Sequence, residues 1–178
     1  IKSGICLTAA HLPGSLNTIA DKESRHSYRD AEWMLTPCIL QEALTALDFK
    51  PEIDLFASRL NKQFSEYCSF RPDPDALYID TFSISWSNKN IYCFPPFSCI
   101  LQILQKIVQD TAQGIVVVPN WPTQPWFPFL KELLVQPPRI VAPSKQMLVL
   151  PAMPEEIHPM YQKLELQICH VSGNKLPP

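Results

Sequence analysis

Residues 90–120, NIYCFPPFSCILQILQKIVQDTAQGIVVVPN, carry the pattern that decides the fold. A β-prone run over 90–97 precedes an amphipathic pattern over 99–113, which predicts a helix ended by Gly114. The Val-rich run over 115–120 is typical of a strand that is buried on both faces. Strand, helix and strand in this order predict two parallel strands joined by a helical crossover.

The rest of the chain continues this alternation of short strands and helices, interrupted by many of its 19 prolines. The further predicted elements are a helix over 37–49 with Thr36 as its N-cap, a strand over 52–58, a helix over 124–134, edge-like strands over 139–143 and 147–151, and a linker over 169–178. We therefore expect an α/β fold in which helices flank a parallel or mixed sheet.

Composition sets the outer bounds of function. With 178 residues, 46% of them hydrophobic, the chain is long enough to bury a core in one domain, with or without an appendage. A net charge of −2 without a basic run argues against a strongly electrostatic nucleic-acid binder and leaves weak or shape-driven contact with DNA or RNA open. No apolar run approaches the ~20 residues of a membrane span, and the first residues lack the pattern of a signal peptide.

These patterns predict an intracellular protein, cytoplasmic or nuclear, that makes no membrane contact; its oligomeric state stays open. The missing initiator Met further predicts that the chain is a fragment of a longer protein. The cysteines form no C-x-x-C pair and lie in apolar surroundings, which favours reduced core thiols over a zinc ribbon or a disulfide scaffold. They are Cys6, Cys38, Cys68, Cys93, Cys99 and Cys169.

The N-terminal stretch LTAAHLPGSLNTIADKESR, residues 7–25, contains the pattern H-x-x-G-x-x-N-x-x-A-D-x-x-S-R. This pattern resembles the C-terminal end of the ribonuclease H domain of retroelement reverse transcriptases. The resemblance implies that His11 is the mobile histidine and Asp21 a metal-binding carboxylate of a two-Mg²⁺ hydrolase site. In that family the other three carboxylates lie upstream, so residues 1–30 are expected to be an inactive remnant with an incomplete metal site.

The order of motifs over 52–130 is similar to that of the phage-type adenine-N6 DNA methyltransferases. It begins with D-x-x-A-S-x-x-N at 54–61, followed by a strand whose end matches N-P-P-Y as Phe94-Pro95-Pro96-Phe97, and then by a hydrophobic strand and an aromatic-rich loop. The resemblance implies a Rossmann-like, methyltransferase-type mixed sheet, S-adenosylmethionine as cofactor and a flipped-out adenine as substrate. It places Asp54 and Asn61 on the cofactor side.

Phe94 decides whether this chemistry survives. In the family, an amide or carboxylate at this position and the carbonyl of the first proline accept the two N–H bonds of adenine N6, while the last aromatic stacks on the base. A phenyl ring accepts no hydrogen bond, and the loss of such a bond costs of order 3 kcal/mol, or about a hundredfold in rate. We therefore expect a degenerate site in which Pro95, Pro96 and Phe97 keep the shape of the motif.

Several residues have a structural alternative. Asp54 and Asn61 also fit a strand-end aspartate and a loop asparagine, and no glycine follows IDLFAS to form a cofactor-binding turn. For the aromatic side chains, packing is favoured over base stacking. Three aspartates could suggest a calcium loop, but the flanking prolines favour a turn. The aromatic residues are Phe97, Trp121, Trp126 and Phe127, and the three aspartates are Asp73, Asp75 and Asp80.

The two resemblances occur together in DIRS-type, tyrosine-recombinase retrotransposons. This arrangement implies a polyprotein piece with a ribonuclease H remnant over 1–30, a connecting helix over 31–50, a methyltransferase-like α/β domain over 51–168 and a linker over 169–178. The expected function is a degenerate domain with a structural or weak nucleic-acid-handling role, whose partners are DNA or RNA and the rest of the polyprotein. An active adenine-N6 methyltransferase and a domesticated host protein that keeps the fold for protein contacts stay open as alternatives.

Overall fold

The computed structural model describes residues 32–175. The chain divides after Ala31, and the residues from Glu32 onward form one compact unit. The predicted ribonuclease H remnant, with His11 and Asp21, lies outside the described residues. The helix predicted as a connection within 31–50 belongs to the same compact unit as the sheet, so it is part of the domain and not a connector to it.

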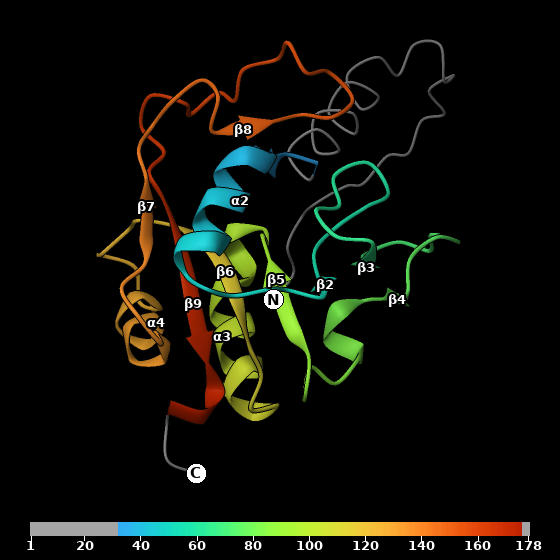
Figure 1. The fold of residues 1–178 in the computed structure, drawn as a ribbon, viewed down its shortest axis with the longest axis vertical. Helices are drawn as coiled ribbons and strands as arrows, with labels where there is room; N and C mark the ends of the chain where they lie inside the picture. Colours follow the sequence, from blue (N-terminus) through green and yellow to red (C-terminus); the bar gives the residue numbers. More distant parts are fainter. Residues whose placement is uncertain (1–31, 176–178) are drawn as a thin grey trace, which may run out of the picture. The chain divides into compact units, whose positions relative to one another are not determined.

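A mixed, seven-stranded sheet forms the centre of this unit, as the strand and helix pattern predicts. Its order is β4-β3-β2-β5-β6-β9-β7, and Figure 1 shows the same order from right to left. The first five strands in this order are parallel to one another, whereas β9 is antiparallel to both β6 and β7. The strands are β2 (Ile53–Asp54), β3 (Glu66–Ser69), β4 (Tyr78–Ile79), β5 (Asn90–Cys93), β6 (Gln113–Pro119), β7 (Arg139–Val141) and β9 (Leu166–Ser172).

A second, two-stranded sheet pairs β1 (Met34–Leu35) with β8 (Leu148–Val149) in antiparallel fashion. The strand predicted over 147–151 therefore exists, but it does not join the large sheet. Its partner β1 precedes the first helix, and this pairing ties the start of the described chain to the long loop before β9.

The predicted crossover is present: α3 (Ile100–Gln109) connects the parallel strands β5 and β6. The helix ends earlier than predicted, because Thr111 adopts a φ of 49° just beyond it. Gly114 does not end the helix. It lies inside β6, opposite Ile91 of β5.

Helices cover both faces of the sheet. On one face, α3 and α4 (Phe127–Leu133) pack with Val116 and Val118 of β6. On the other face, α2 (Pro37–Ala46) packs with Ile115 and Val117. The side chains of residues 115–118 in β6 are all fully buried, which confirms the prediction of a strand buried on both faces.

The predicted linker over 169–178 is wrong for its first residues. Residues 166–172 form β9, whose side chains are all buried between β6 and β7. Leu166 and Ile168 face the α2 side and Cys169 and Val171 the α3 side, so the strand contributes to both cores. Because β9 contains polar residues, its sequence did not indicate a buried strand.

The Trp86 segment between β4 and β5 is fixed to the end of α3. The backbone N–H of Trp86 donates to the Asp110 carboxylate at 2.7 Å, and its indole N–H donates to the carbonyl of Thr81 at 2.9 Å. Lys106 forms an ion pair with Asp110 at 3.0 Å. These bonds hold a largely irregular segment, which contains only the short 3-10 helix η2 (Thr81–Ser83), against the regular part of the domain.

The five described cysteines are free thiols. Cys68, Cys93 and Cys169 are buried, as predicted for core thiols, whereas Cys38 is exposed and Cys99 is partly exposed. Burial raises the pKa of Cys68 to about 11 and that of Cys169 to about 12, so both are protonated at neutral pH. Among the described residues, none of the helices has the length and apolar character of a membrane span.

Candidate functional site

The strand order of the large sheet reverses between β2 and β5. From β2 the following strands run toward β4, and from β5 they run the opposite way toward β6. In open α/β sheets, ligands bind at such a switch point, outside the carboxyl ends of the strands. Asp54 ends β2, and Phe94 directly follows β5, so both stand at this point.

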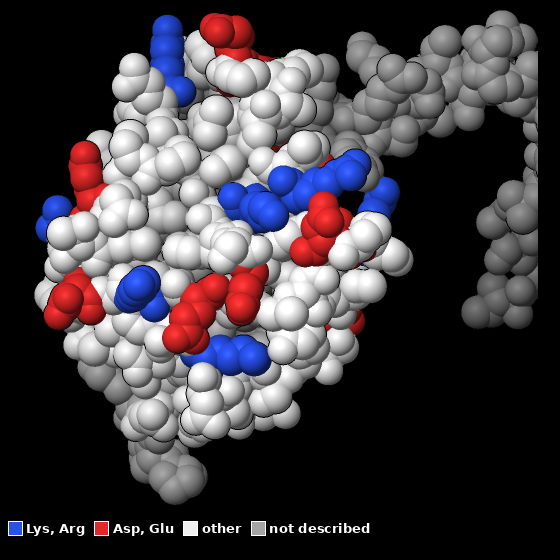
Figure 2. All heavy atoms as spheres, turned by 45° about the vertical axis from the view of Figure 1, so that its right-hand side comes forward, with Lys and Arg blue, Asp and Glu red and all other residues white. Residues whose placement is uncertain are grey.

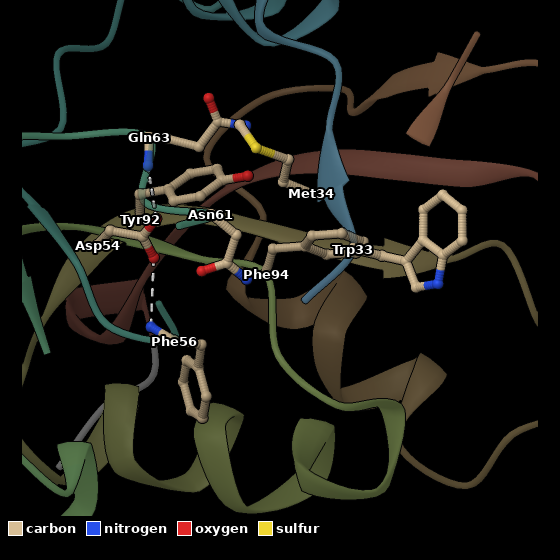
Figure 3. Close-up of a pocket in the computed structure, with 8 residues that line it drawn as sticks. All are labelled: Trp33, Met34, Asp54, Phe56, Asn61, Gln63, Tyr92 and Phe94. Atoms are coloured by element: carbon tan, nitrogen blue, oxygen red, sulfur yellow. Dashed lines mark hydrogen bonds between the residues drawn. The ribbon is translucent and has the colours of Figure 1, made fainter. Parts of the chain in front are cut away.

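A small cavity of about 10 Å³ lies at the switch point, which is room for about one water molecule. It brings together Asp54, Asn61 and Phe94, three of the residues selected from the sequence (Figure 3). It also contains residues that sequence reasoning missed. The full lining is Trp33, Met34, Asp54, Phe56, Asn61, Gln63, Tyr92 and Phe94.

Asp54 is a buried carboxyl group held by the loop that follows β2. One oxygen accepts the backbone N–H of Phe56 at 3.2 Å, and the other accepts that of Gln63 at 3.1 Å. Burial raises its pKa from 3.8 to about 7, against the opposing effect of these two hydrogen bonds. The carboxyl group therefore titrates near neutral pH, and its two oxygens organise the loop.

Asn61 lies in the same loop and closes a turn. Its side-chain oxygen accepts the backbone N–H of Ser58 at 2.7 Å and the Ser58 hydroxyl at 3.2 Å. This is the role of a loop asparagine, one of the two alternatives for this residue. In Figure 3 its amide lies beside the ring of Phe94, within the cavity lining.

The Pro-Pro step lies between β5 and α3. Pro95 is buried and Pro96 exposed, and a short 3-10 helix, η3 (Phe97–Cys99), follows directly and leads into α3. The ring of Phe97 meets the ring of Trp121 edge-on, with 5.2 Å between their centroids. Phe97 is therefore partly buried and packs against another aromatic residue.

Trp126 and Phe127 belong to the core beside α4, with exposed fractions of 7% and 6%. Together with the Phe97–Trp121 contact, this places the four aromatic residues of the sequence analysis in packing positions. The structure thus favours packing over stacking for all of them.

The three aspartates of the suspected calcium loop do not converge. Asp73 accepts the backbone N–H of Asp75 at 3.1 Å, as in an Asx turn, and Asp80 caps η2 by accepting the N–H of Phe82 at 3.1 Å. Within residues 32–175, no cluster of His, Cys, Asp and Glu has the arrangement of a metal site.

A segment from the start of the described chain covers the cavity. Trp33 and Met34 line it, and the side-chain N–H of Gln63 donates to the carbonyl of Leu35 at 2.6 Å. The sequence carries no local signal for this contact, because the position of the segment depends on the pairing of β1 with β8.

Tyr92 is the other polar group that sequence reasoning missed, although its place in the alternation of β5 could have indicated an inward orientation. Its hydroxyl is buried and makes no hydrogen bond with a described residue. Burial, followed by the nearby charges of Asp54 and Cys93, raises the pKa of Tyr92 well above its usual value.

We expect Tyr92→Phe to leave the free energy of unfolding unchanged or to raise it by about 1 kcal/mol, because it removes a buried hydroxyl that lacks a partner. Urea unfolding followed by circular dichroism measures this change. A loss of stability greater than about 1 kcal/mol would show that the hydroxyl has a partner in solution.

No protein-family model matches the chain, and no curated protein matches it. The chemistry of the site therefore has to be argued from its own residues.

Within the cavity the arrangement can hold a proton on Asp54 near neutral pH and admit a molecule of about the size of water. A site for a nucleoside or a drug-sized ligand usually needs ~300–1,000 Å³. The small space at the switch point is instead lined by Phe94 and by the segment that contains Trp33 and Met34.

Proposed function

We propose that the chain is a catalytically degenerate, methyltransferase-like module of a retrotransposon polyprotein, with a structural or weak nucleic-acid-handling role. The observation that carries this proposal is the position of Phe94-Pro95-Pro96-Phe97 at the switch point of the sheet. The origin in a polyprotein rests on the ribonuclease H-like motif with His11 and Asp21 and on the order of the two motif sets.

The sheet topology supports a Rossmann-like, methyltransferase-type fold. If the strands of the large sheet are numbered 1 to 7 along the chain, their spatial order is 3-2-1-4-5-7-6. This is the dinucleotide-binding order 3-2-1-4-5-6 with one extra strand inserted before the last. The inserted strand, β9, is the antiparallel one, and such an insertion is what a methyltransferase-type mixed sheet is expected to contain.

The adenine side of the site supports degeneracy. Phe94 stands where an acceptor for adenine N6 would be needed, and its ring lines a cavity of only about 10 Å³. An adenine base would have to displace the Phe94 ring. Its N6 group would also lack the hydrogen-bond acceptor at this position. Both losses act on the same step of the reaction.

The cofactor side supports the same conclusion. Residues 55–65, which connect the parallel strands β2 and β3, contain no helix and no glycine. In Rossmann-like folds this connection supplies a glycine-rich turn and a helix N-terminus that faces the cofactor. Here the two oxygens of Asp54 and the amide oxygen of Asn61 hold the irregular loop together instead.

The second candidate is an active, S-adenosylmethionine-dependent adenine-N6 methyltransferase. It is favoured by the convergence of Asp54, Asn61 and Phe94 at one cavity, although Phe94 lies more than 30 residues from the other two in the sequence. In this case the segment at Trp33 and Met34 would have to move to admit the cofactor.

Titration calorimetry with S-adenosylmethionine distinguishes the two candidates. We expect no binding heat and no transfer of a labelled methyl group to adenine-containing DNA, because the cavity has room for only about one water molecule. Micromolar affinity for the cofactor would contradict the degenerate function. The Phe94→Asn variant tests the adenine side separately: if it recovers methyl transfer, only one step of the chemistry has been lost. Tyr92→Phe serves as a cavity-lining control that adds no amide.

A further inference from the structure

The β3–β4 end of the sheet carries the most exposed aromatic side chain of the described residues. Phe70 directly follows β3 and is 87% exposed. Leu60, Leu77 and Ile79 are each about half exposed on the adjoining loops and on the edge strand β4. Several apolar side chains therefore face solvent at one end of the sheet, although a soluble domain usually buries or scatters them.

Backbone hydrogen bonds bring these loops together around Tyr67. The N–H of Ala57 donates to Cys68 at 3.2 Å, just before the loop over 58–63, and the N–H of Leu77 donates to Tyr67 at 2.9 Å. Ser69 pairs with Ile79 in the β3–β4 ladder. The loop over 58–63 and the segment over 70–79 therefore both adjoin β3.

Three cations belong to the same loops: Arg59, Lys62 and Arg71. The ammonium group of Lys62 lies 4.6 Å from the centre of the Tyr67 ring. Figure 2 turns this side of the molecule forward and shows Lys and Arg atoms in a band across it, with Asp and Glu atoms beside them.

Acidic residues belong to the same region: Glu66, Asp75 and Asp80 are exposed, whereas Asp73 is directed into its own loop. The carboxylate of Asp73 accepts hydrogen bonds from the N–H of Asp75 and, at 3.0 Å, from the hydroxyl of Tyr67. The N–H of Asp75, the hydroxyl of Tyr67 and the adjacent Arg59 together lower the pKa of Asp73. The negative charge of Asp73 is therefore partly compensated within the loop. Arg59, Lys62 and Arg71 all occupy exposed positions.

We propose that this surface, formed by Arg59, Leu60, Lys62, Phe70, Arg71 and Leu77 and called here the Phe70 surface, binds single-stranded nucleic acid. The ring of Phe70 stacks on an unpaired base, and the cations contact the phosphates on either side. An exposed aromatic flanked by Lys and Arg is the combination that single strands require, because every base offers a π face and the backbone is anionic. In a duplex the bases are already stacked on one another, so Phe70 would gain no partner.

This assignment rests on the proposed nucleic-acid-handling role and deepens it. It places the contact on the exposed β3–β4 end. The loop over 58–63 also contributes Asn61 and Gln63 to the cavity, but the proposed contact uses side chains that do not line it, so binding does not require any methyltransferase chemistry. Because the chain has a net charge of −2 and the surface only three cations, the binding is weak and sensitive to salt.

Fluorescence anisotropy with a labelled oligothymidine of ~15 nucleotides tests the Phe70 surface. We expect binding at low salt that weakens about 20-fold between 50 and 200 mM salt, as three phosphate contacts on a single strand predict. Phe70→Ala should weaken binding about tenfold. The double variant Arg59→Ala, Arg71→Ala should weaken it further and flatten the dependence on salt.

Phe70 is almost fully exposed, so its truncation leaves the core intact, which circular dichroism can verify. Ile140→Ala is the matched control for apolar surface, because Ile140 is 53% exposed on β7 at the opposite end of the sheet. Lys145→Ala is the control for charge. Both controls should bind the oligonucleotide as the unmodified chain does.

Three outcomes would overturn the assignment: no binding at low salt, equal affinity of Phe70→Ala and the unmodified chain, or a preference for duplex DNA. None of these bears on S-adenosylmethionine, whose binding is measured separately. Failure of the Phe70 surface and failure of the proposed degeneracy are therefore distinguishable.

Discussion

Gly114→Ala is expected to destabilise the domain by about 3 kcal/mol, a large share of the stability of a domain of this size. A Cβ atom on Gly114 would lie 2.3 Å from Cγ1 of Ile91 and 2.3 Å from its backbone oxygen. Both residues belong to the central pair β5–β6, which cannot separate easily because β2 and β9 flank it within the sheet. Urea unfolding followed by circular dichroism measures the loss.

A double variant separates the two contacts of Gly114. Adding Ile91→Ala removes the Cγ1 atom but leaves the backbone oxygen at 2.3 Å, so we expect little recovery. Ile140→Ala on the edge strand β7 is the control, with a change within about 0.5 kcal/mol. Because Ala is favoured over Gly in a strand by ~0.5–1 kcal/mol, an unchanged or more stable Gly114→Ala variant would show that the two strands do not approach as closely as described.

Asp54 is expected to make the domain less stable as the pH rises from about 4 to about 7. Its pKa is raised from 3.8 to about 7 in the folded state, so folding favours the protonated carboxyl group. The contribution of Asp54 to the free energy of unfolding is greatest below the pKa of the unfolded state. This contribution is lost as the pH rises through the pKa of the folded state. The shift corresponds to roughly 4 kcal/mol at most, since one pKa unit is about 1.4 kcal/mol.

Asp54→Asn should remove this dependence on pH. The amide carries no charge at any pH, but its single oxygen cannot serve both N–H groups, those of Phe56 and Gln63, so the variant should lose about 1–3 kcal/mol at pH 4. The stability curves of the variant and the unmodified chain are then expected to approach or cross near neutral pH. Urea unfolding at pH 4 to 8 checks this, with the exposed Glu132→Gln as control. Parallel curves for Asp54→Asn and the unmodified chain would contradict the raised pKa.

Local sequence patterns were sufficient to predict those helices and strands whose residues follow a single pattern throughout. The apolar spacing of α2 and α3, the β-branched run of β6 and the stop at Pro95-Pro96 all appear at the predicted places. The end of α3 was misplaced because a glycine usually marks a helix end. Gly114 serves instead to let β5 and β6 approach each other.

The sequence patterns did not predict β9, because the polar residues of this strand have their hydrogen-bond partners on other elements of the fold. His170 lies between the side-chain amides of Gln113 and Gln136, at 3.1 and 3.2 Å from its two ring nitrogens. Gln167 donates to the side chain of Asn120. Polar residues of this kind normally predict a loop, and only the neighbours supplied by β6 and the segment after α4 make them compatible with a central strand.

For the site, the sequence by itself determined the chemical identity of the motif: an acidic residue after the first strand, a Pro-Pro step between aromatic residues and a phenyl ring where an acceptor is needed. Those are properties of residue types and their order, so they need no coordinates. The tertiary structure alone decided that Asp54, Asn61 and Phe94 share one cavity, that the segment at Trp33 and Met34 also lines it, and that Phe70 stands exposed near the β4 edge of the sheet. The physical reason is that burial, pKa and available volume depend on which segments the sheet order and the β1–β8 pairing bring together, and no local pattern encodes those neighbours.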